Sequence, residues 1–245
     1  MTAYRHSANR TATSPPQPQV PRKSIAFERG SLWVLELVNK KKAPDLFNPE
    51  IPASIGEISG DLVEDLTRAM NFNDSRLVIK RLASGRCFAG RVASKIATYC
   101  WVSTTHECIG ELEHEIHMPP GEAYIWDCAT LPRFRGNHLY TALLTAIINQ
   151  LYCEGYRRIW IGASLENRPS LRAFIRSGFH LAATMYYARA GNFGCLLILK
   201  NHKAFSNVIP TIHHMLAASQ ERVVGPFLLT ASRPISPPPC METQS

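Results

Sequence analysis

The chain has 245 residues, of which 45% are hydrophobic and 19% charged, and these proportions are typical of a globular protein that can bury a core without disulfides. Its formal net charge is +8, but residues 1–30 carry five cations against one anion and residues 201–245 carry three against two. Because most of the excess positive charge lies in these two terminal segments, we expect a solubilising basic tail and not a nucleic-acid partner. The seven cysteines are scattered, with no Cys-x-x-Cys pair, which indicates free thiols in a reducing, cytoplasmic compartment.

Composition divides the chain into three parts. Residues 1–23 are rich in Pro, Ser, Thr and Arg, so we expect a disordered tail there. Residues 24–200 carry the periodic patterns of one folded domain. Residues 201–245 form an extension in which 211–222 are expected to be helical and the proline-rich end disordered. No run is apolar over the length that a membrane span requires, so no membrane span is expected.

The first half of the domain predicts one strand, two helices and a hairpin. Asp74 is a suitable N-cap for the second helix and Gly85 a suitable end. Residues 43–58, which contain three prolines, and the acidic stretch 105–121 are expected to be irregular. The elements expected are a strand at 31–38, helices at 60–70 and 75–83, and hairpin strands at 86–93 and 95–104.

The second half of the domain alternates strands and helices. Leu139, Leu143, Ile147 and Leu151 recur along one side of a period-3.6 helix, which is the clearest such pattern in the chain. Pro169 suits the first turn of a later helix, where its missing N–H costs nothing. The elements expected are a strand from Glu122 to Thr130, a helix at 139–154, a strand at 157–163, a helix at 169–176 and a closing hairpin of 180–189 with 194–200.

Three histidines, His106, His114 and His117, lie close together in the acidic stretch. His114 and His117 do not have the spacing of the zinc-protease helix, in which the second histidine follows His-Glu one turn later. We therefore expect a solvated loop there and no metal ion.

A basic turn, Pro132-Arg-Phe-Arg-Gly-Asn-His138, joins the strand that ends at Thr130 to the helix that begins at Leu139. The first N–H groups of a helix have no partner inside the helix, and together with the helix dipole they favour a pyrophosphate. Arg135 adds positive charge at the same place, and Arg133 can assist it. Taken alone, the same residues also fit an ordinary strand-to-helix loop with two surface arginines.

The wider arrangement resembles the GNAT superfamily of acyl-coenzyme A-dependent N-acetyltransferases, from about residue 75 to about residue 200. The resemblance implies an α/β (mixed α+β) fold with a central mixed, mostly antiparallel sheet and helices on both faces. It also implies that the sheet is splayed between the strands near 124–130 and 158–163. The residues that carry the resemblance are Arg135 and Gly136 in the phosphate loop, Asn167 and Ser170 in an Asn-x-x-Ser loop, and the pair Gly178-Phe179.

By the same resemblance, the donor is acetyl-CoA or another acyl-CoA and the acceptor is an amine. The splay would receive the pantetheine arm, and backbone N–H groups at the end of the strand would polarise the thioester carbonyl. The residues implied for CoA binding are Cys128, Ala129, Thr130, Arg135, Gly136, Asn137, His138, Leu139, Tyr140, Asn167 and Ser170.

Two features depart from the family's pattern. The loop glycines of the family fall on His138 and Tyr140, so phosphate contact would rely on helix N–H groups that carry side chains. Phe174 stands seven residues after Asn167, where many relatives have a tyrosine that protonates the leaving thiolate. Tyr140, Tyr186 or water would have to replace that tyrosine, or the thiolate leaves unprotonated.

Transfer also needs a group that takes the proton of the attacking ammonium. Asp127, an acid inside an apolar strand, is the first candidate, because burial would raise its pKa; it fits a structural hydrogen bond to a neighbouring loop equally well. Glu122, at the start of the strand, is the second candidate, with a solvated strand end as the simpler interpretation. Cys128 has no histidine partner in the sequence pattern and is interpreted as a buried thiol.

The function implied is an N-acyltransferase, of the class that transfers groups other than aminoacyl groups, acting by direct attack in a ternary complex. The basic charge also suits an acyl-carrier protein as donor. One alternative is a GNAT-fold binding or regulatory module with a degraded cofactor loop, and another is a nucleic-acid-binding protein that acts through its tail. A homodimer is left open, and no motif identifies the acceptor.

Overall fold

The computed structural model describes residues 25–38, 45–109, 114–190, 193–216, 222–224 and 227–231. The tail expected at 1–23, residues 217–221 of the expected C-terminal helix, and the proline-rich end lie outside these residues. Within the described ranges, no helix has the length and apolar character needed to cross a membrane.

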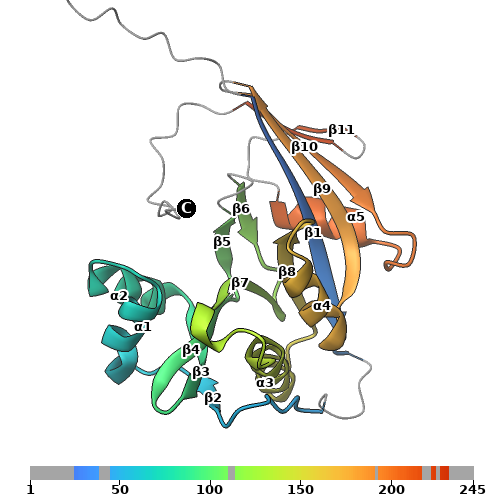
Figure 1. The fold of residues 1–245 in the computed structure, drawn as a ribbon. Coiled ribbons are helices and arrows are strands. Elements are labelled where there is room, and N and C mark those ends of the chain that lie inside the picture. The colour runs from blue at the N-terminus through green and yellow to red at the C-terminus, as the bar shows by residue number, and fades with distance from the viewer. Residues whose placement is uncertain are drawn as a thin grey trace, which may run out of the picture.

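Within the described ranges, ten strands form one sheet at the centre of the molecule (Figure 1). Their order is β11-β12-β10-β9-β1-β8-β7-β4-β3-β2, and every pairing is antiparallel except that of β7 with β8. The mixed, mostly antiparallel sheet predicted from the sequence is therefore confirmed. The strands are β1 (Ile25–Glu36), β2 (Ser54–Glu57), β3 (Arg86–Val92), β4 (Lys95–Ser103), β7 (Glu122–Thr130), β8 (Arg158–Ser164), β9 (His180–Ala190), β10 (Phe193–Lys200), β11 (Arg222–Val224) and β12 (Phe227–Ala231).

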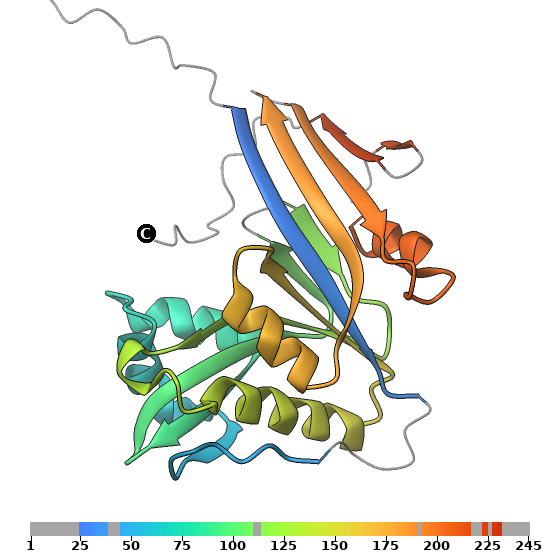
Figure 2. The ribbon, with the colours of Figure 1, turned by 45° about the vertical axis from the view of Figure 1, so that its right-hand side comes forward.

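One face of the sheet is covered by α3 (Leu139–Cys153) and α4 (Arg168–Arg176), which lie next to each other (Figure 2). The apolar stripe of α3 is buried, and Leu143 and Ile147 have no exposed surface. Both belong to one apolar cluster with Ile125 of β7. Because burial of such a side chain contributes about 1.5–3 kcal/mol, the stripe holds α3 against the sheet.

The opposite face is covered by three other helices and a small hairpin. There α1 (Val63–Ala69) and α2 (Ser75–Ser84) pack over β3 and β4. Further along the same face, α5 (Val208–Leu216) shares an apolar cluster with β1, β8, β9 and β10. The hairpin of β5 (His106–Ile109) and β6 (His114–His117) joins this cluster. The prediction of helices on both faces is confirmed.

Several short elements differ from the sequence-based expectations. The acidic stretch 105–121 contains the hairpin of β5 and β6, and the stretch 43–58 contains β2. These strands have four residues each and no clear apolar alternation, so neither their length nor a period of two distinguishes them from a loop in the sequence. The C-terminal helix begins at Val208, three residues earlier than expected. After it, β12 pairs with β10 and extends the sheet.

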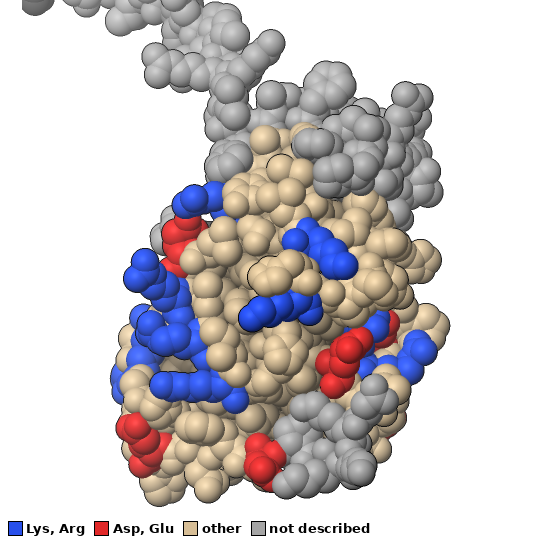
Figure 3. All heavy atoms as spheres, turned by 90° about the vertical axis from the view of Figure 1, so that its right-hand side faces the viewer, with Lys and Arg blue, Asp and Glu red and all other residues tan. Residues whose placement is uncertain are grey.

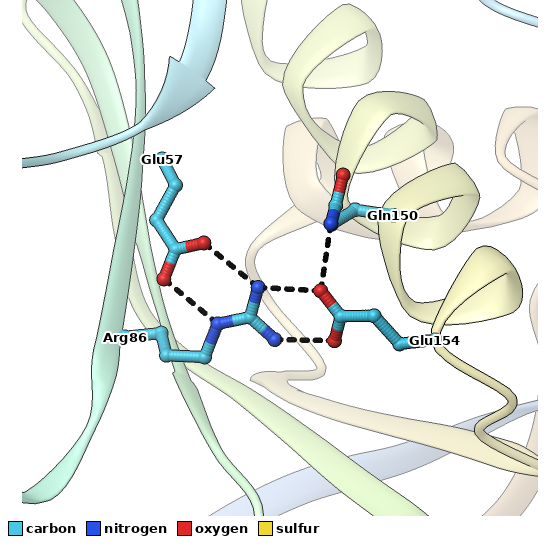
Figure 4. A network of polar contacts seen from close by, with 4 residues as sticks. All are labelled: Glu57, Arg86, Gln150 and Glu154. Carbon is cyan, nitrogen blue, oxygen red and sulfur yellow. Dashed lines mark hydrogen bonds and ion pairs between the residues drawn. The ribbon is translucent and has the colours of Figure 1, made fainter.

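A network of charges ties the end of α3 to the sheet (Figure 4). Arg86 of β3 donates two hydrogen bonds of 2.8 Å to Glu57 of β2 and two, of 2.6 and 2.8 Å, to Glu154 just after α3. Gln150 donates a further bond of 2.7 Å to Glu154. The Arg86 guanidinium holds the pKa of Glu154 below its usual value. The network therefore joins an edge strand, its neighbour and the main helix.

Candidate active site

Strands β7 and β8 run side by side only over their first halves. The parallel pairs extend from Glu122 with Arg158 to Ile125 with Ile161. Beyond them both strands continue, β7 as far as Thr130, with no further pair between the two. The backbone groups of β7 that face β8 in this stretch are therefore outside the hydrogen bonding of the sheet. This is the splay that the family resemblance implied.

A bulge in β7 follows directly after the paired stretch. On its other side β7 pairs with β4, and there Asp127 and Cys128 together stand opposite Cys100 alone. Asp127 has a left-handed φ of 41°, which is uncommon for a residue with a Cβ. A bulge interrupts the alternation of side chains along a strand. Cys128 consequently packs against the cluster under α3, whereas Asp127 is exposed.

The carboxylate of Asp127 forms an ion pair with Arg81 of α2. The Arg81 guanidinium lies over three aromatic rings, 4.9 Å from the centroid of Trp126, 5.6 Å from that of Trp101 and 5.4 Å from that of Phe72. The side chain of Asp127 is 31% exposed and that of Arg81 is 19% exposed. The burial expected for Asp127 is therefore absent, and its carboxylate instead connects α2 to the bulge.

The environment of Glu122 differs from the solvated strand end that the simpler interpretation of the sequence predicted. It is buried, with 6% of its surface exposed. Its carboxylate accepts a hydrogen bond of 2.9 Å from Arg158 Nη1 and one of 2.6 Å from Trp160 Nε1. Glu122 lies at the closed end of the splay, where β7 is still paired with β8. Both donors come from β8, so the carboxylate fastens the two strands where they are joined.

The basic turn leads directly into α3. Residues Pro132–Phe134 form a short 3-10 turn, and Gly136 follows with a φ of 87°, a left-handed conformation that glycine adopts without strain. A Cβ at Gly136 would meet no atom within 4 Å, so this side of the loop is open. Arg135 donates a hydrogen bond of 3.1 Å from Nε to the Thr130 carbonyl and is exposed.

His138 is the N-cap residue of α3 and also has a left-handed φ, of 56°. Its Nε2 lies 3.2 Å from a carboxylate oxygen of Glu50, and its Nδ1 lies 3.0 Å from Nη1 of Arg176 in α4. The ring packs edge-on to Phe47 at 5.7 Å between centroids. These contacts fix the imidazole against neighbouring segments. The side chain at the family's glycine position thus has partners of its own.

Asn167 and Ser170 lie at the start of α4. Asn167 is the N-cap residue, and its Oδ1 accepts a hydrogen bond of 3.3 Å from the Ser170 amide. Gly178, with a φ of 87°, follows the helix, and Phe179 is buried behind it. These residues therefore have a local structural role, because they begin and end α4 beside the splay.

Tyr140 is the second residue of α3, and its side chain turns toward the sheet. Its ring packs edge-on to Phe174 at 6.4 Å between centroids, and its side chain belongs to the apolar cluster that also contains Cys128 and Cys100. Burial, followed by the neighbouring thiols of Cys128 and Cys100, raises the pKa of this hydroxyl well above its ordinary value. Tyr140 therefore stays protonated at neutral pH and can act as a donor.

Exposed arginines lie on the basic turn and along α4. Arg168, Arg172 and Arg176 follow one another at four-residue intervals along α4, and all three are exposed, as are Arg133 and Arg135 of the turn. Figure 3 shows Lys and Arg side chains gathered along one border of the face that it presents. An anionic ligand that approaches the start of α3 therefore meets a positive potential.

Three partners of the candidate residues were absent from the sequence-based expectations. Arg81 lies 46 residues before Asp127, whereas Arg158 and Trp160 lie 36 and 38 residues after Glu122. These separations in sequence are too long to belong to a local motif, so only the pairing of the strands and the packing of α2 bring these groups together. The exposed or buried state of each carboxylate follows from those contacts.

Comparison with known proteins bears on the same region. The sequence profile of the acetyltransferase (GNAT) family matches residues 62–179, which include β7, the basic turn, α3, β8 and α4. No curated protein matches the sequence at a significant level.

Solved structures with similar folds are distant in sequence. An acetyltransferase of the GNAT family from Novosphingobium aromaticivorans is 15% identical, with 76% of this chain and 72% of that chain covered and a TM-score of 0.49. A GCN5-related N-acetyltransferase from Sphaerobacter thermophilus is 15% identical over 74% of this chain and 55% of that chain, with a TM-score of 0.49. An aminoglycoside N-acetyltransferase in complex with CoA is 18% identical over 52% and 91%, with a TM-score of 0.40.

Proposed function

We propose, from the premise that residues 62–179 form a domain of the acetyltransferase (GNAT) family, that this chain transfers an acyl group from coenzyme A to an amine. The observation that carries the proposal is the position of the splay between β7 and β8, which opens beside the basic turn at the start of α3. One end of a long, anionic thioester can be held at that turn while its acyl end lies between the strands.

The diphosphate of the donor is assigned to the first turn of α3. Helix N–H groups without intrahelical partners and the helix dipole favour a doubly charged group there. Gly136 leaves room for close approach, and the contacts of His138 with Glu50 and Arg176 hold its ring in place. The residues proposed for CoA binding are Cys128, Ala129, Thr130, Arg135, Gly136, Asn137, His138, Leu139, Tyr140, Asn167 and Ser170.

The chemical step is direct attack of the amine nitrogen on the thioester carbonyl. Holding both reactants in one cleft supplies much of the rate, and the unpaired backbone N–H groups near Cys128 to Thr130 polarise the carbonyl oxygen. Of the two carboxylates, Asp127 lies in the unpaired stretch of β7, so we propose it as the base. Glu122 is the second candidate, although both of its donors belong to the closed end of the splay.

Calorimetric titration of the full chain with acetyl-CoA and with CoA tests the donor site. Binding is expected for both, and Arg135→Glu is expected to weaken it at least tenfold because the new carboxylate faces the diphosphate. Lys80→Glu makes the same charge change on α2, on the other face of the sheet, and serves as the control. Equal affinities of the two variants would remove Arg135 from the site.

Turnover is tested by following free CoA with a thiol reagent while acetyl-CoA is mixed with a panel of amines. The panel contains a polyamine, an aminoglycoside, a lysine-containing peptide and a peptide with a free α-amine. CoA release that depends on one amine supports the enzyme. Binding of acetyl-CoA without release for any amine would instead support a binding module with this fold.

The exposed arginines of α4 favour one variant of this function, in which an acyl-carrier protein is the donor. A carrier protein presents an acidic surface beside its thioester arm, and a row of arginines beside the slot complements it. The same release assay, run with an acetylated carrier protein in place of acetyl-CoA, decides which donor the chain prefers. A lower catalytic efficiency with the carrier protein would assign the arginines to CoA alone.

A further inference from the structure

Aromatic rings hold the guanidinium of Arg81 in place. Its central carbon lies over the rings of Trp126, Trp101 and Phe72, between 4.9 and 5.6 Å from their centroids. The Trp126 ring is fixed in turn, because its Nε1 donates a hydrogen bond of 2.9 Å to Ser103 Oγ. Contact with aromatic faces satisfies the charge of a guanidinium but leaves the N–H donors at its edge available. Arg81 is therefore a positioned donor and not a mobile surface cation.

Most of these donors have no acceptor. Nη1 of Arg81 donates to Asp127, and among the residues that the structure describes, its Nε and Nη2 have no hydrogen-bond partner. Within the same ranges the buried indole N–H of Trp101, whose ring the guanidinium covers, has no partner either. Only 19% of the Arg81 side chain is exposed, so solvent reaches it poorly. Unused donors on a planar cation match the two oxygens of a carboxylate.

Asp127 places this group beside the slot. It lies in the stretch of β7 that has no pair with β8, and its left-handed φ of 41° is the kind of backbone strain that concentrates at functional sites. Its partner belongs to α2, so both side chains lie on the face that carries α1 and α2, whereas the diphosphate is assigned to α3 on the other face. An acceptor that enters from the α2 face therefore meets a carboxylate and a guanidinium together.

We propose that the acceptor is a small amine with a carboxylate next to its nitrogen, of the α-amino acid type, and that Arg81 binds this carboxylate. The inference rests on the proposed function and names the acceptor class for it. The Nε and Nη2 edge of Arg81 receives the two carboxylate oxygens, while Nη1 stays on Asp127. The ammonium group then lies beside the Asp127 carboxylate, at the open part of the splay. The transfer step itself is unchanged.

An amine without a carboxylate fits this pair less well. A simple ammonium ion would compete with Arg81 for Asp127, which is the only carboxylate partner of that guanidinium among the described residues. A partly buried charge that loses its partner raises the free energy of the complex. A zwitterion avoids this loss, because it brings one new partner for each of the two charges. The pair therefore selects for an acceptor that carries both signs of charge.

The first test uses the wild-type chain with acetyl-CoA. Release of CoA is measured with free leucine, phenylalanine, lysine and glutamate, and with the α-carboxamide of each, which keeps the amine but has no α-carboxylate. For at least one pair, kcat/KM is expected to be at least tenfold higher for the amino acid than for its amide. Calorimetric titration of the CoA-bound protein with the same compounds measures the same preference without turnover.

The second test is Arg81→Gln in the full chain. The ratio of kcat/KM between the amino acid and its amide is expected to fall to about 1, with the Kd for acetyl-CoA changed less than twofold. General damage to α2 would lower both efficiencies by one factor and leave their ratio as it is. Arg76→Gln serves as the control, because Arg76 lies in the first turn of the same helix and its side chain is 87% exposed. It is expected to leave the ratio unaltered.

Three results would overturn the assignment. These are a higher efficiency with the amide in every pair, an unchanged ratio in Arg81→Gln, and a polyamine that is acetylated more efficiently than every amino acid. If Arg81→Gln does not fold, the wild-type preference decides alone. Failure of the wild-type chain to bind acetyl-CoA, or to release CoA with any amine, counts against the proposed function; tighter binding of an amino acid than of its amide would still support this acceptor site.

Discussion

The buried carboxylate of Glu122 allows a quantitative test of whether it is structural. Its side chain is 7% exposed and accepts hydrogen bonds from Arg158, whose side chain is 19% exposed, and from the Trp160 indole. Glu122→Ala would leave a partly buried guanidinium without its inner partner and a buried N–H without an acceptor. Losses of this kind cost about 3–5 kcal/mol, which corresponds to a fall of about 10 °C in the unfolding midpoint of a chain of this size. Urea unfolding followed by circular dichroism measures the loss.

The same guanidinium provides the matched control. Glu36 of β1 accepts a hydrogen bond of 3.0 Å from the other terminal nitrogen of Arg158, but its side chain is 53% exposed. Glu36→Ala is expected to cost about 0–1 kcal/mol, since an exposed pair is screened by solvent. A difference of less than about 1 kcal/mol between the two variants would refute the reasoning. Full stability of Glu122→Ala together with lost turnover would return Glu122 to the catalytic candidates.

Two further predictions concern the acid limb of stability and the space beside Tyr124. In the folded chain, Arg86 lowers the pKa of Glu154 below its ordinary value of 4.5. The pair therefore stabilises the fold above about pH 4.5, and this contribution is lost as the pH falls through the lowered pKa. Glu154→Gln should flatten that part of a plot of unfolding free energy against pH, and an unaltered slope would exclude the linkage. Gly162→Ala should lower the free energy of unfolding by about 1–3 kcal/mol through overpacking, because the new Cβ would lie 3.2 Å from the Tyr124 hydroxyl oxygen. A double-mutant cycle with Tyr124→Phe should show positive coupling between the two positions. Additive effects would show that the two side chains do not compete for space.

Elements with strong periodicity were predictable from the sequence. Helix α3, with its stripe of Leu and Ile, and the strands on either side of it occur where the pattern indicated. The paired hairpins of β3 with β4 and of β9 with β10 also follow their predicted ranges to within a few residues. The short strands β2, β5 and β6 did not, because four residues on a sheet edge or in a separate hairpin carry too little alternation to be distinguished from a loop.

The candidate site was predictable in its backbone and less so in its side chains. The positions of Arg135, Gly136 and Asn167 follow from the order of strand, turn and helix. The exposure of Asp127 does not, because the bulge at Asp127 and Cys128 interrupts the alternation expected along β7. The burial of Glu122 depends on donors from β8 that are distant in the sequence. Local sequence patterns therefore predict the backbone elements, whereas long-range contacts determine which carboxylate is exposed to solvent.

The two borders of the large sheet have a consequence for self-association. Among the residues that the structure describes, they are formed by β2 and β11, with four and three residues respectively. Strands this short present few unpaired amides and carbonyls to an incoming chain, so the sheet is a poor template for side-by-side polymerisation. Two copies that met in solution would therefore be expected to join through helices or loops, and not by merging their sheets into one.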